Sequence, residues 1–514
     1  MTIDESPRPR GEEGASQLAP RLPDPDGEPQ PVSTPPRPPA RELDRYAGLF
    51  SARTRQMKSS AMRDLMAITE RPEVISLAGG LPDTSTFAPE SYAAIMQTVA
   101  AQSCARALQY GPTEGLALMR RWIVEVMAEE DTAVDPDDVL ITTGAQQAID
   151  LVCKALIDPG DVVITEAPTY PGAVPTFNAY EADVIQLEMD DDGLSVAELH
   201  RTLDGLEADG RRPKLLYTIP NFHNPAGVTM SLPRRRRLIE LARERELLVV
   251  EDNPYGLLRY DGERLPTLRR LDGPTAAEGS GGFVIYLGTL SKILSPGIRL
   301  GWVVAPRPVL EKLRVGKASA DLCSSSMTQH FAAAYFEEGR WRDYLASLRT
   351  LYAHRRDTML DALSEHFPRE AHWTRPQGGL FLWVTLPDYI DTTDLLARAL
   401  RENVAFVPGS AAYVDGRGGS SMRLNFSGVS DDDIREGVRR IGKVVREQIS
   451  LYGTLTGAPA ATEALGRDAR TPGEPAASTP LGSPEPGERA LADVVSLPRR
   501  DPRPEGVRER RDDR

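Results

Sequence analysis

The sequence predicts an α/β protein with a large, mostly parallel sheet flanked by helices and a second, smaller α+β domain. Three observations support this prediction. Between residues 139 and 252, short apolar runs alternate with longer stretches of helical periodicity. Some of these runs, such as 247–250, are apolar at consecutive positions, as strands buried on both faces of a sheet are. After about residue 307 the alternation ends, and long helical stretches precede a separate group of strands.

The first part of the chain supplies the strands of the large sheet. The strand candidates are residues 139–144, 162–166, 182–189, 214–220, 247–252, 283–290 and 299–305. A helix over 145–157 follows the first strand, and a second helix opens at Ser231 and runs to residue 246. Ser231 suits the N-cap of this second helix, and Pro233 suits its first turn.

The smaller domain begins with helices and ends with strands. We expect helices from residue 307 and between 326 and about 367. Strands and one further helix follow, with the strands at 378–386, 403–408 and 421–427.

Both ends of the chain differ in composition from the part between them. Residues 1–45 and 456–514 together hold 20 of the 43 prolines and no Phe, Trp or Tyr. Such segments cannot bury enough apolar surface to offset the loss of chain entropy. We predict a disordered Pro-rich tail at each end of a folded body, residues 46–455; a fused targeting or regulatory role for the tails stays open.

Charge and composition argue against several classes of function. The chain has 61 basic and 75 acidic residues and a formal net charge of -14, which disfavours a protein that grips nucleic-acid phosphates. The arginine run at 234–237 is interpreted as a solvated helix face beside Glu240 and Glu244. The six histidines are scattered without metal-ligand spacing, so we predict no metal site.

The same features predict a cytoplasmic protein without a membrane partner. The sequence has no apolar run of ~18–20 residues that could span a membrane. Its first residues lack the basic-then-apolar order of a secretory signal. Three cysteines, Cys104, Cys153 and Cys323, are odd in number and far apart, as in a reduced, intracellular protein.

Lys292 is the first candidate for a chemical role. Only seven of the 61 basic residues are lysines, and six of these lie in polar or helical surroundings where a solvated amine is expected. Lys292 instead follows an apolar strand, close in sequence to two hydroxyl side chains and to Arg299. A desolvated lysine near a cation loses its proton more easily and can attack carbonyl groups. Taken alone, Lys292 fits a structural role at least as well.

Other chemistry-bearing residues follow other predicted strands. Asp252 ends one strand, Asn224 and Tyr170 each follow another, and residues 144–146 lie between a strand and a helix. Open α/β sheets bind ligands at the carboxyl ends of their strands. Each residue alone also suits a turn, a strand-end cap or the core, but their joint placement predicts a ligand site at this edge.

Nine motifs follow one another along the body of the chain. They are ISLAGGLPD (75–83), LQYGPTEGL (108–116), TTGAQQAID (142–150), EAPTY (166–170), PNFHNPAG (220–227), EDNPYG (251–256), GTLSKILSPGIRLGW (288–302), QGGLFLW (377–383) and MRLNFS (422–427). With these motifs in this order, residues 58–450 resemble the pyridoxal-phosphate-dependent class I/II aminotransferases of fold type I, and most closely the kynurenine/2-aminoadipate aminotransferase subgroup. The resemblance implies an N-terminal arm and part of the small domain at 46–92, a large cofactor-binding domain at 93–325 and a small C-terminal domain at 326–455.

The resemblance implies roles around the ring of pyridoxal 5′-phosphate. Lys292 would carry the cofactor covalently and move a proton between the substrate Cα and the cofactor C4′. Asp252 would pair with the pyridinium nitrogen. Tyr170 would stack on the ring, while Asn224 and Tyr255 would hydrogen-bond its O3′ oxygen.

The resemblance also implies a phosphate-binding cup. The backbone N–H groups of Ala145 and Gln146 at a helix N-terminus, the hydroxyls of Thr289 and Ser291, and Arg299 would form it. The family has serine at the positions of Ala145 and Thr289; the first change removes a hydroxyl but keeps the backbone donor.

Further matched residues concern the substrate and the neighbouring subunit. Arg423 matches the arginine that binds the substrate α-carboxylate, with Gly80 and Asn224 beside the substrate. Arg63 aligns with a mobile arginine that in some relatives meets a side-chain carboxylate. Tyr110 matches a residue that reaches the phosphate of the neighbouring subunit, so we expect a homodimer with the active site at its interface.

These matches predict an aminotransferase that exchanges the amino group between an L-amino acid and a 2-oxo acid. The expected acceptor is 2-oxoglutarate, and the expected donor is 2-aminoadipate-like, aromatic or branched-chain. Two alternatives stay open. One is another reaction on the same cofactor, such as a lyase or decarboxylase reaction, because one fold hosts several chemistries. The other is the effector domain of a transcription regulator, although the Pro-rich residues 1–45 do not resemble the DNA-binding module that such regulators carry.

Overall fold

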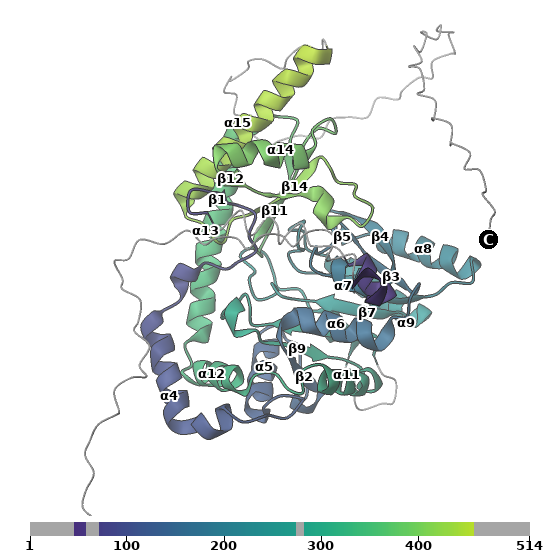
Figure 1. The fold of residues 1–514 in the computed structure, drawn as a ribbon, viewed down its shortest axis with the longest axis vertical. Helices are drawn as coiled ribbons and strands as arrows, with labels where there is room; N and C mark the ends of the chain where they lie inside the picture. Colours follow the sequence, from purple (N-terminus) through teal and green to yellow (C-terminus); the bar gives the residue numbers. More distant parts are fainter. Residues whose placement is uncertain (1–45, 58–70, 274–281, 457–514) are drawn as a thin grey trace, which may run out of the picture. The chain divides into compact units, whose positions relative to one another are not determined.

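The computed structural model describes residues 46–57, 71–273 and 282–456. Its largest feature is an eight-stranded sheet with the order β2-β9-β8-β7-β6-β3-β4-β5 (Figure 1). The strands are β2 (Val139–Thr142), β3 (Val162–Ala167), β4 (Asp183–Asp190), β5 (Gly193–Leu194), β6 (Pro213–Thr218), β7 (Leu248–Asp252), β8 (Val284–Thr289) and β9 (Gly301–Val304). The predicted α/β class with a mostly parallel large sheet is confirmed.

Two strands of this sheet run against their neighbours: β9, second from one edge, and β5, at the other edge. β3 pairs parallel with β4 and β6, and the parallel pairing continues through β7 to β8. β9 pairs antiparallel with both β8 and β2. Since β2 and β8 both oppose β9, they share one direction. The carboxyl ends of β2, β3, β6, β7 and β8 therefore meet at one edge of the sheet.

Helices cover both faces of the large sheet (Figure 1). One face packs against α6 (Gly144–Leu156), α7 (Val174–Ala179) and α11 (Arg307–Ala320), and the other against α8 (Val196–Ala208), α9 (Leu232–Arg245) and α10 (Leu268–Asp272). Consecutive strand residues serve opposite faces: Leu215 belongs to the first core and Leu216 to the second. This explains why the strands are apolar at successive positions. Ser231 is the N-cap of α9, as predicted.

A smaller antiparallel sheet has the order β10-β11-β14-β13. Its strands are β10 (His372–Trp373), β11 (Phe381–Thr385), β13 (Val407–Pro408) and β14 (Ser421–Asn425). A separate pair joins β1 (Ile75–Ser76) in parallel to β12 (Val404–Ala405). The predicted strand 403–408 is thus divided between two sheets.

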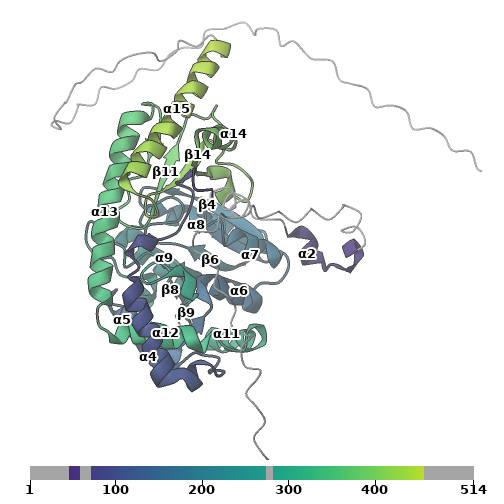
Figure 2. The ribbon, with the colours of Figure 1, turned by 60° about the vertical axis from the view of Figure 1, so that its left-hand side comes forward.

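Six longer helices complete the described residues (Figures 1 and 2). They are α4 (Pro89–Ala107), α5 (Ala117–Ala128), α12 (Ser326–Glu337), α13 (Trp341–His366), α14 (Thr392–Ala399) and α15 (Asp431–Thr456). The sequence analysis did not identify α4, α5 or α15. A short helix, α2 (Ala52–Gln56), precedes them in the chain.

The largest apolar core includes residues from both sheets, among them Ile141, Val304, Leu382 and Leu424. All the described residues fall within one unit of the chain. The predicted boundaries at 92/93 and 325/326 stay predictions. The predicted tails lie outside the described residues, apart from Thr456 at the end of α15. No helix among residues 46–57, 71–273 and 282–456 is long and apolar enough to cross a membrane.

Candidate active site

A cavity of about 360 Å³ lies where the five strands end together. Every site residue predicted from the sequence lines it except Tyr110 and Arg63. The predicted residues that line it are Gly80, Ala145, Gln146, Tyr170, Asn224, Asp252, Tyr255, Thr289, Ser291, Lys292, Arg299 and Arg423.

Strand ends position most of these residues. Asp252 is the last residue of β7 and Thr289 the last of β8, while Ala145 and Gln146 lie in the first turn of α6, directly after β2. Tyr170 follows β3 and Asn224 follows β6. β14 of the small sheet brings Arg423 to the cavity from the other side. The strand-end argument thus accounts for the clustering.

The surroundings of Lys292 lower the proton affinity of its amine. Its amine donates a hydrogen bond to the carbonyl oxygen of Gly80 at 2.5 Å. Burial lowers the pKa of Lys292 to about 8, and the positive charges of Arg423 and Arg299 act in the same direction. At this pKa a substantial fraction of the amine is neutral near pH 8 and can act as a nucleophile.

Asp252 is a buried carboxylate with one oxygen satisfied and one free. The hydroxyl of Tyr217 donates to Oδ2 at 2.6 Å. Oδ1 is buried and has no hydrogen-bond partner among the described residues. Burial raises the pKa of Asp252 to about 6, the Tyr217 hydrogen bond opposes this rise, and the charge of Glu166 adds to it.

Arg423 forms the opposite side of the cavity. Its guanidinium donates to Asn224 Oδ1 at 3.0 Å and to the Ala78 carbonyl at 2.7 Å, and it lies 4.4 Å from the ring centre of Phe381. Burial lowers its pKa to about 10, so it stays charged at neutral pH. The Nε atom is buried without a partner in the described part of the chain. An anion in the cavity would satisfy this donor.

The first turn of α6 and the β8–β9 connection form a polar end of the cavity. A Cβ on Gly144 would lie 2.5 Å from Nη2 of Arg299, so only glycine lets this guanidinium lie against the turn. Gly144 also has a φ of 75°, which glycine adopts without strain. The Thr289 hydroxyl donates to Ser291 Oγ at 2.9 Å. The N–H groups of a first helical turn have no partner within their helix.

Comparisons with known proteins agree with this geometry. The family model described as aminotransferase class I and II matches residues 72–441. The aromatic-amino-acid aminotransferase 1 of Thermococcus litoralis is 42% identical over 405 residues, which are 79% of this chain and 95% of that protein. The chain belongs to the class I and II aminotransferases.

Two solved structures resemble this aminotransferase. The kynurenine aminotransferase of Pyrococcus horikoshii, in complex with PMP, has a TM-score of 0.74 and 41% identity, covering 79% of this chain and 98% of that chain. The α-aminoadipate aminotransferase of Thermus thermophilus, complexed with N-(5′-phosphopyridoxyl)-L-leucine, has a TM-score of 0.72 and 36% identity. The match covers 79% of this chain and 99% of that chain. Fold type I, amino-acid transamination and the cofactor pyridoxal 5′-phosphate are therefore confirmed for this chain.

The residues of this aminotransferase fit its cofactor. The free Oδ1 of Asp252 needs a donor, and a protonated ring nitrogen is one. The N-terminal turn of α6 and Arg299 suit a phosphate. Gln146 offers only its backbone there, because its side-chain amide donates to the Gly172 carbonyl and to Thr176.

Several lining residues of the aminotransferase were not identified from the sequence. They are mostly apolar and include Leu81, Ile149, Ile219 and Phe381. Ile219 directly follows β6 and Phe381 begins β11, so in sequence they resemble ordinary core residues. No periodicity separates an apolar residue that lines a ligand cavity from one that fills the core.

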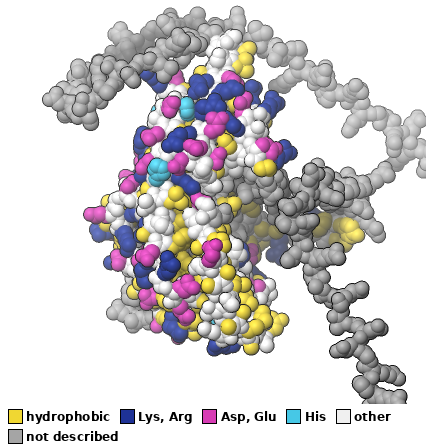
Figure 3. Space-filling model, turned by 90° about the vertical axis from the view of Figure 1, so that its left-hand side faces the viewer, with side chains coloured by type: hydrophobic (Ala, Val, Ile, Leu, Met, Phe, Trp, Pro, Cys, Tyr) yellow, Lys and Arg dark blue, Asp and Glu magenta, His cyan; other side chains and the backbone are white. Residues whose placement is uncertain are grey.

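Two predicted site residues are not among those that line the cavity. Tyr110 follows α4 and is 77% exposed. Figure 3 shows the side of the molecule that carries α4. Apolar side chains gather in the lower half of this view. Met96 and Leu108 of this region are also exposed. Arg63 lies outside the described residues, so its predicted role stays a prediction.

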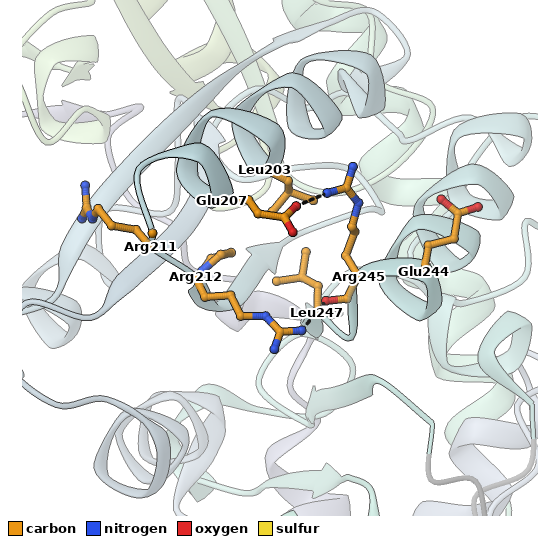
Figure 4. Close-up of a pocket in the computed structure, with 9 residues that line it drawn as sticks. Leu203, Glu207, Arg211, Arg212, Glu244, Arg245 and Leu247 are labelled. Carbon is orange, nitrogen blue, oxygen red and sulfur yellow. Dashed lines mark hydrogen bonds and ion pairs between the residues drawn. The ribbon is translucent and has the colours of Figure 1, made fainter.

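A second cavity, of about 490 Å³, lies at the opposite edge of the sheet, beside Pro213 at the start of β6 and Leu247 just before β7 (Figure 4). Its arginines already have anionic partners: Arg211 pairs with Asp183, Arg212 with Glu246 at 3.1 Å and Arg245 with Glu207 at 2.9 Å. It contains none of the predicted site residues, and its paired charges offer no free cation for a ligand.

Proposed function

We propose that this aminotransferase passes the amino group of an L-amino acid to 2-oxoglutarate. The observation that carries the proposal is the convergence of three groups in one cavity: a lysine amine of lowered pKa, a carboxylate with one free oxygen and a buried guanidinium. A reaction at the α-carbon of an amino acid needs these groups for proton transfer, charge stabilisation and carboxylate binding.

Each residue has a defined task in the proposed reaction. The bound cofactor supplies an electron sink for the charge that develops when the Cα proton leaves. Lys292 would take the proton from the substrate Cα and return it to the bound cofactor. Asp252 keeps the ring nitrogen protonated, which sustains the electron sink. Arg423 binds the α-carboxylate with its planar fork and so fixes which Cα bond faces the lysine.

The remaining contacts hold the cofactor in place. Tyr170 would stack on its ring, and the Tyr255 hydroxyl and the Asn224 amide, which are 3.4 Å apart, would hydrogen-bond its O3′ oxygen. The backbone of Ala145 and Gln146 and the side chains of Thr289, Ser291 and Arg299, which line the cavity, would bind its phosphate. Gly80 lies against the substrate, where a side chain would reduce the space beside Phe381.

The lining favours donors with apolar side chains. Leu81, Ile219 and Phe381 give the cavity a mainly apolar wall. We infer an aromatic or branched-chain donor, or a 2-aminoadipate-like donor if Arg63 reaches the cavity. The names of the relatives, aromatic-amino-acid, kynurenine and α-aminoadipate aminotransferases, span the same range. A cytoplasmic location is part of the proposal.

Two measurements test the reaction and the attachment site. Adding a single amino donor to the cofactor-loaded enzyme should convert the aldehyde form of the cofactor to its amine form, and 2-oxoglutarate should reverse the change. Release of ammonia or carbon dioxide instead would support a lyase or decarboxylase. Borohydride reduction and peptide mapping should place the cofactor label on Lys292; label on any other lysine contradicts the assignment.

The active unit is proposed to be a homodimer in which Tyr110 reaches the phosphate in the partner's site. The exposure of its ring, at 77%, is consistent with a residue that acts on another chain. Lys292→Ala and Tyr110→Phe should each impair activity. Unfolding and refolding the two variants together should give hybrid dimers with one intact site out of two. Because random pairing makes half of the dimers hybrids, the mixture should have about a quarter of wild-type activity. No recovery above the two separate variants would contradict a shared site.

A further inference from the structure

Tyr217 is a buried residue of β6 that lies behind the cavity rather than in its wall. Its side chain is 1% exposed, and its ring packs edge-to-face against Phe177 at 5.5 Å between ring centres. The hydroxyl donates to Oδ2 of Asp252 at 2.6 Å. This is the one hydrogen bond to the Asp252 side chain among the described residues. The position of the hydroxyl is fixed by core packing, so it restricts the orientation of the carboxylate.

A second carboxylate lies behind Asp252. Glu166 accepts hydrogen bonds from the Thr218 hydroxyl at 2.6 Å and from the Ile219 backbone at 2.9 Å. His223 Nε2 is 3.0 Å from the same carboxylate. The Ala226 N–H donates to His223 Nδ1, which assigns the ring proton to Nε2, facing Glu166. Glu166 is therefore held in place by three neighbouring groups.

These two neighbours act on Asp252 in opposite directions. The charge of Glu166 opposes ionisation of Asp252, whereas the Tyr217 hydrogen bond favours it. The hydroxyls of Tyr170 and Tyr255 are also close enough to Asp252 to feel its charge. Asp252 pairs with a protonated ring nitrogen as an anion, and burial, the Tyr217 hydrogen bond and the charge of Glu166 together act on its ionisation.

We propose that Tyr217 is a positioning residue that holds Asp252 ionised and turned so that its free oxygen faces the ring nitrogen of the cofactor. The proposal rests on the proposed function, because it assigns Asp252 to that nitrogen. Occupying Oδ2 leaves Oδ1, which has no partner among the described residues, as the acceptor for the ring nitrogen, and the short hydrogen bond stabilises the anion against Glu166. Tyr217 does not line the cavity.

The test uses binding rather than turnover. Pyridoxamine 5′-phosphate and its 1-deaza analogue, in which C–H replaces the ring nitrogen, are dialysed to equilibrium against the cofactor-free protein. Neither compound carries an aldehyde, so neither bonds to Lys292. The readout is the ratio of the two dissociation constants. Partial unfolding scales both constants equally and leaves this ratio unchanged. Tyr217→Phe keeps the ring and the core volume and removes the hydroxyl alone.

The wild type should bind the nitrogen-containing compound more tightly than the analogue. Tyr217→Phe should reduce that preference by roughly tenfold, the effect of losing a hydrogen bond to a charged group, and leave the analogue within about twofold. Tyr286→Phe is the control: this tyrosine is equally buried, and its hydroxyl contacts Glu130 and Asn253 instead of Asp252. The ratio of the two dissociation constants in Tyr286→Phe should equal that of the wild type.

Other results would overturn the inference. Equal weakening of both compounds in Tyr217→Phe would mean that the hydroxyl supports the folded protein without acting on Asp252. Two unchanged dissociation constants would mean that the hydroxyl has no influence on the site. If Tyr217 acts through the carboxylate, adding Tyr217→Phe to Asp252→Asn should not change the ratio further. A wild-type protein that binds neither compound would contradict the proposed function itself. This result is distinguishable from the results above, which concern Tyr217 alone.

Discussion

A lysine amine attacks a carbonyl only when it has released its proton, and the surroundings of Lys292 favour that release. Burial, and then the charges of Arg423 and Arg299, lower its pKa to about 8. Below that pH the amine is protonated and inert, and above it the amine is neutral and reactive. We expect the rate at which the cofactor-free protein captures pyridoxal 5′-phosphate to rise through a midpoint near pH 8, as measured by stopped-flow absorbance.

Removing a neighbouring cation tests the cause of this shift. Arg423→Gln takes away one positive charge and should move the midpoint to higher pH, because the protonated amine is then less disfavoured. Arg417→Gln is a suitable control, since Arg417 lies on the surface and pairs with Glu188 and Asp415. A midpoint that shifts equally in both variants would contradict a local electrostatic cause.

Arg63 is the residue on which substrate choice is expected to depend. Arg423 is proposed to bind the α-carboxylate, so a dicarboxylic substrate needs a second cation, and the planar fork of an arginine suits it. Arg63→Ala should weaken transition-state binding of dicarboxylates by ~1.5–3 kcal/mol, the range for hydrogen bonds to charged groups. Apolar donors should be far less affected in the first half-reaction. Equal kcat/KM for 2-oxoglutarate in wild type and variant would show that Arg63 makes no such contact.

The sequence analysis identified the polar residues that line the cavity, but it did not identify the residues behind them that hold them in place. Asp252, Asn224 and Lys292 were found because polar groups at the ends of apolar strands are conspicuous. Tyr217, one of several aromatic or apolar residues in β6, resembles a core residue, and its hydrogen bond to Asp252 depends on the pairing of β6 with β7. Such pairings between strands cannot be read from one segment of sequence.

At the level of elements, α15 shows what glycine allows in a helix. Gly442 lies where α15 passes the end of α13, and a Cβ there would be 2.4 Å from the His366 carbonyl oxygen. Gly442→Ala should therefore destabilise the fold by about 1–3 kcal/mol through overpacking, even though alanine is the better helix former. The melting temperature reports this change.

A matched control separates packing from helix propensity. Gly205 lies within α8, and a Cβ there would meet nothing within 4 Å. Gly205→Ala should raise stability by about 0.5–1 kcal/mol. Destabilisation of similar size at both positions would contradict the packing argument for Gly442.

The strands of the large sheet other than β5 could be predicted because they are mostly apolar at successive positions, but two features of the elements could not. The direction of β9 depends on the connection that follows β8, and a strand has the same apolar pattern in either direction. α15 was missed although Ile434, Val438, Ile441 and Val445 are buried at helical spacing. Gly437 and Gly442 interrupt its helix-forming composition, and close packing explains Gly442 only once the structure is known.

At the scale of the whole molecule, the two terminal segments should contribute little to stability. Residues 1–40 and 460–514 have no aromatic side chain with which to build a core. A chain without them should keep its melting temperature nearly unchanged and still bind the cofactor, as followed by thermal unfolding and visible absorbance. A large drop in melting temperature would show that these segments dock onto the body.

The reversal at β9 also determines which ligands the whole molecule can hold. Because β9 returns antiparallel beside β8, Lys292 and Arg299 lie in one hairpin connection whose two ends are pinned by the pairing of Thr289 with Gly301. Gly301 has no room for a side chain, as a Cβ would lie 2.8 Å from the Ala145 nitrogen at the phosphate end. The span between the segment that carries Lys292 and the proposed phosphate anchor is thus limited by backbone geometry. We expect the protein to select its cofactor by length, accepting a ligand only when its aldehyde and its anion are separated by that span.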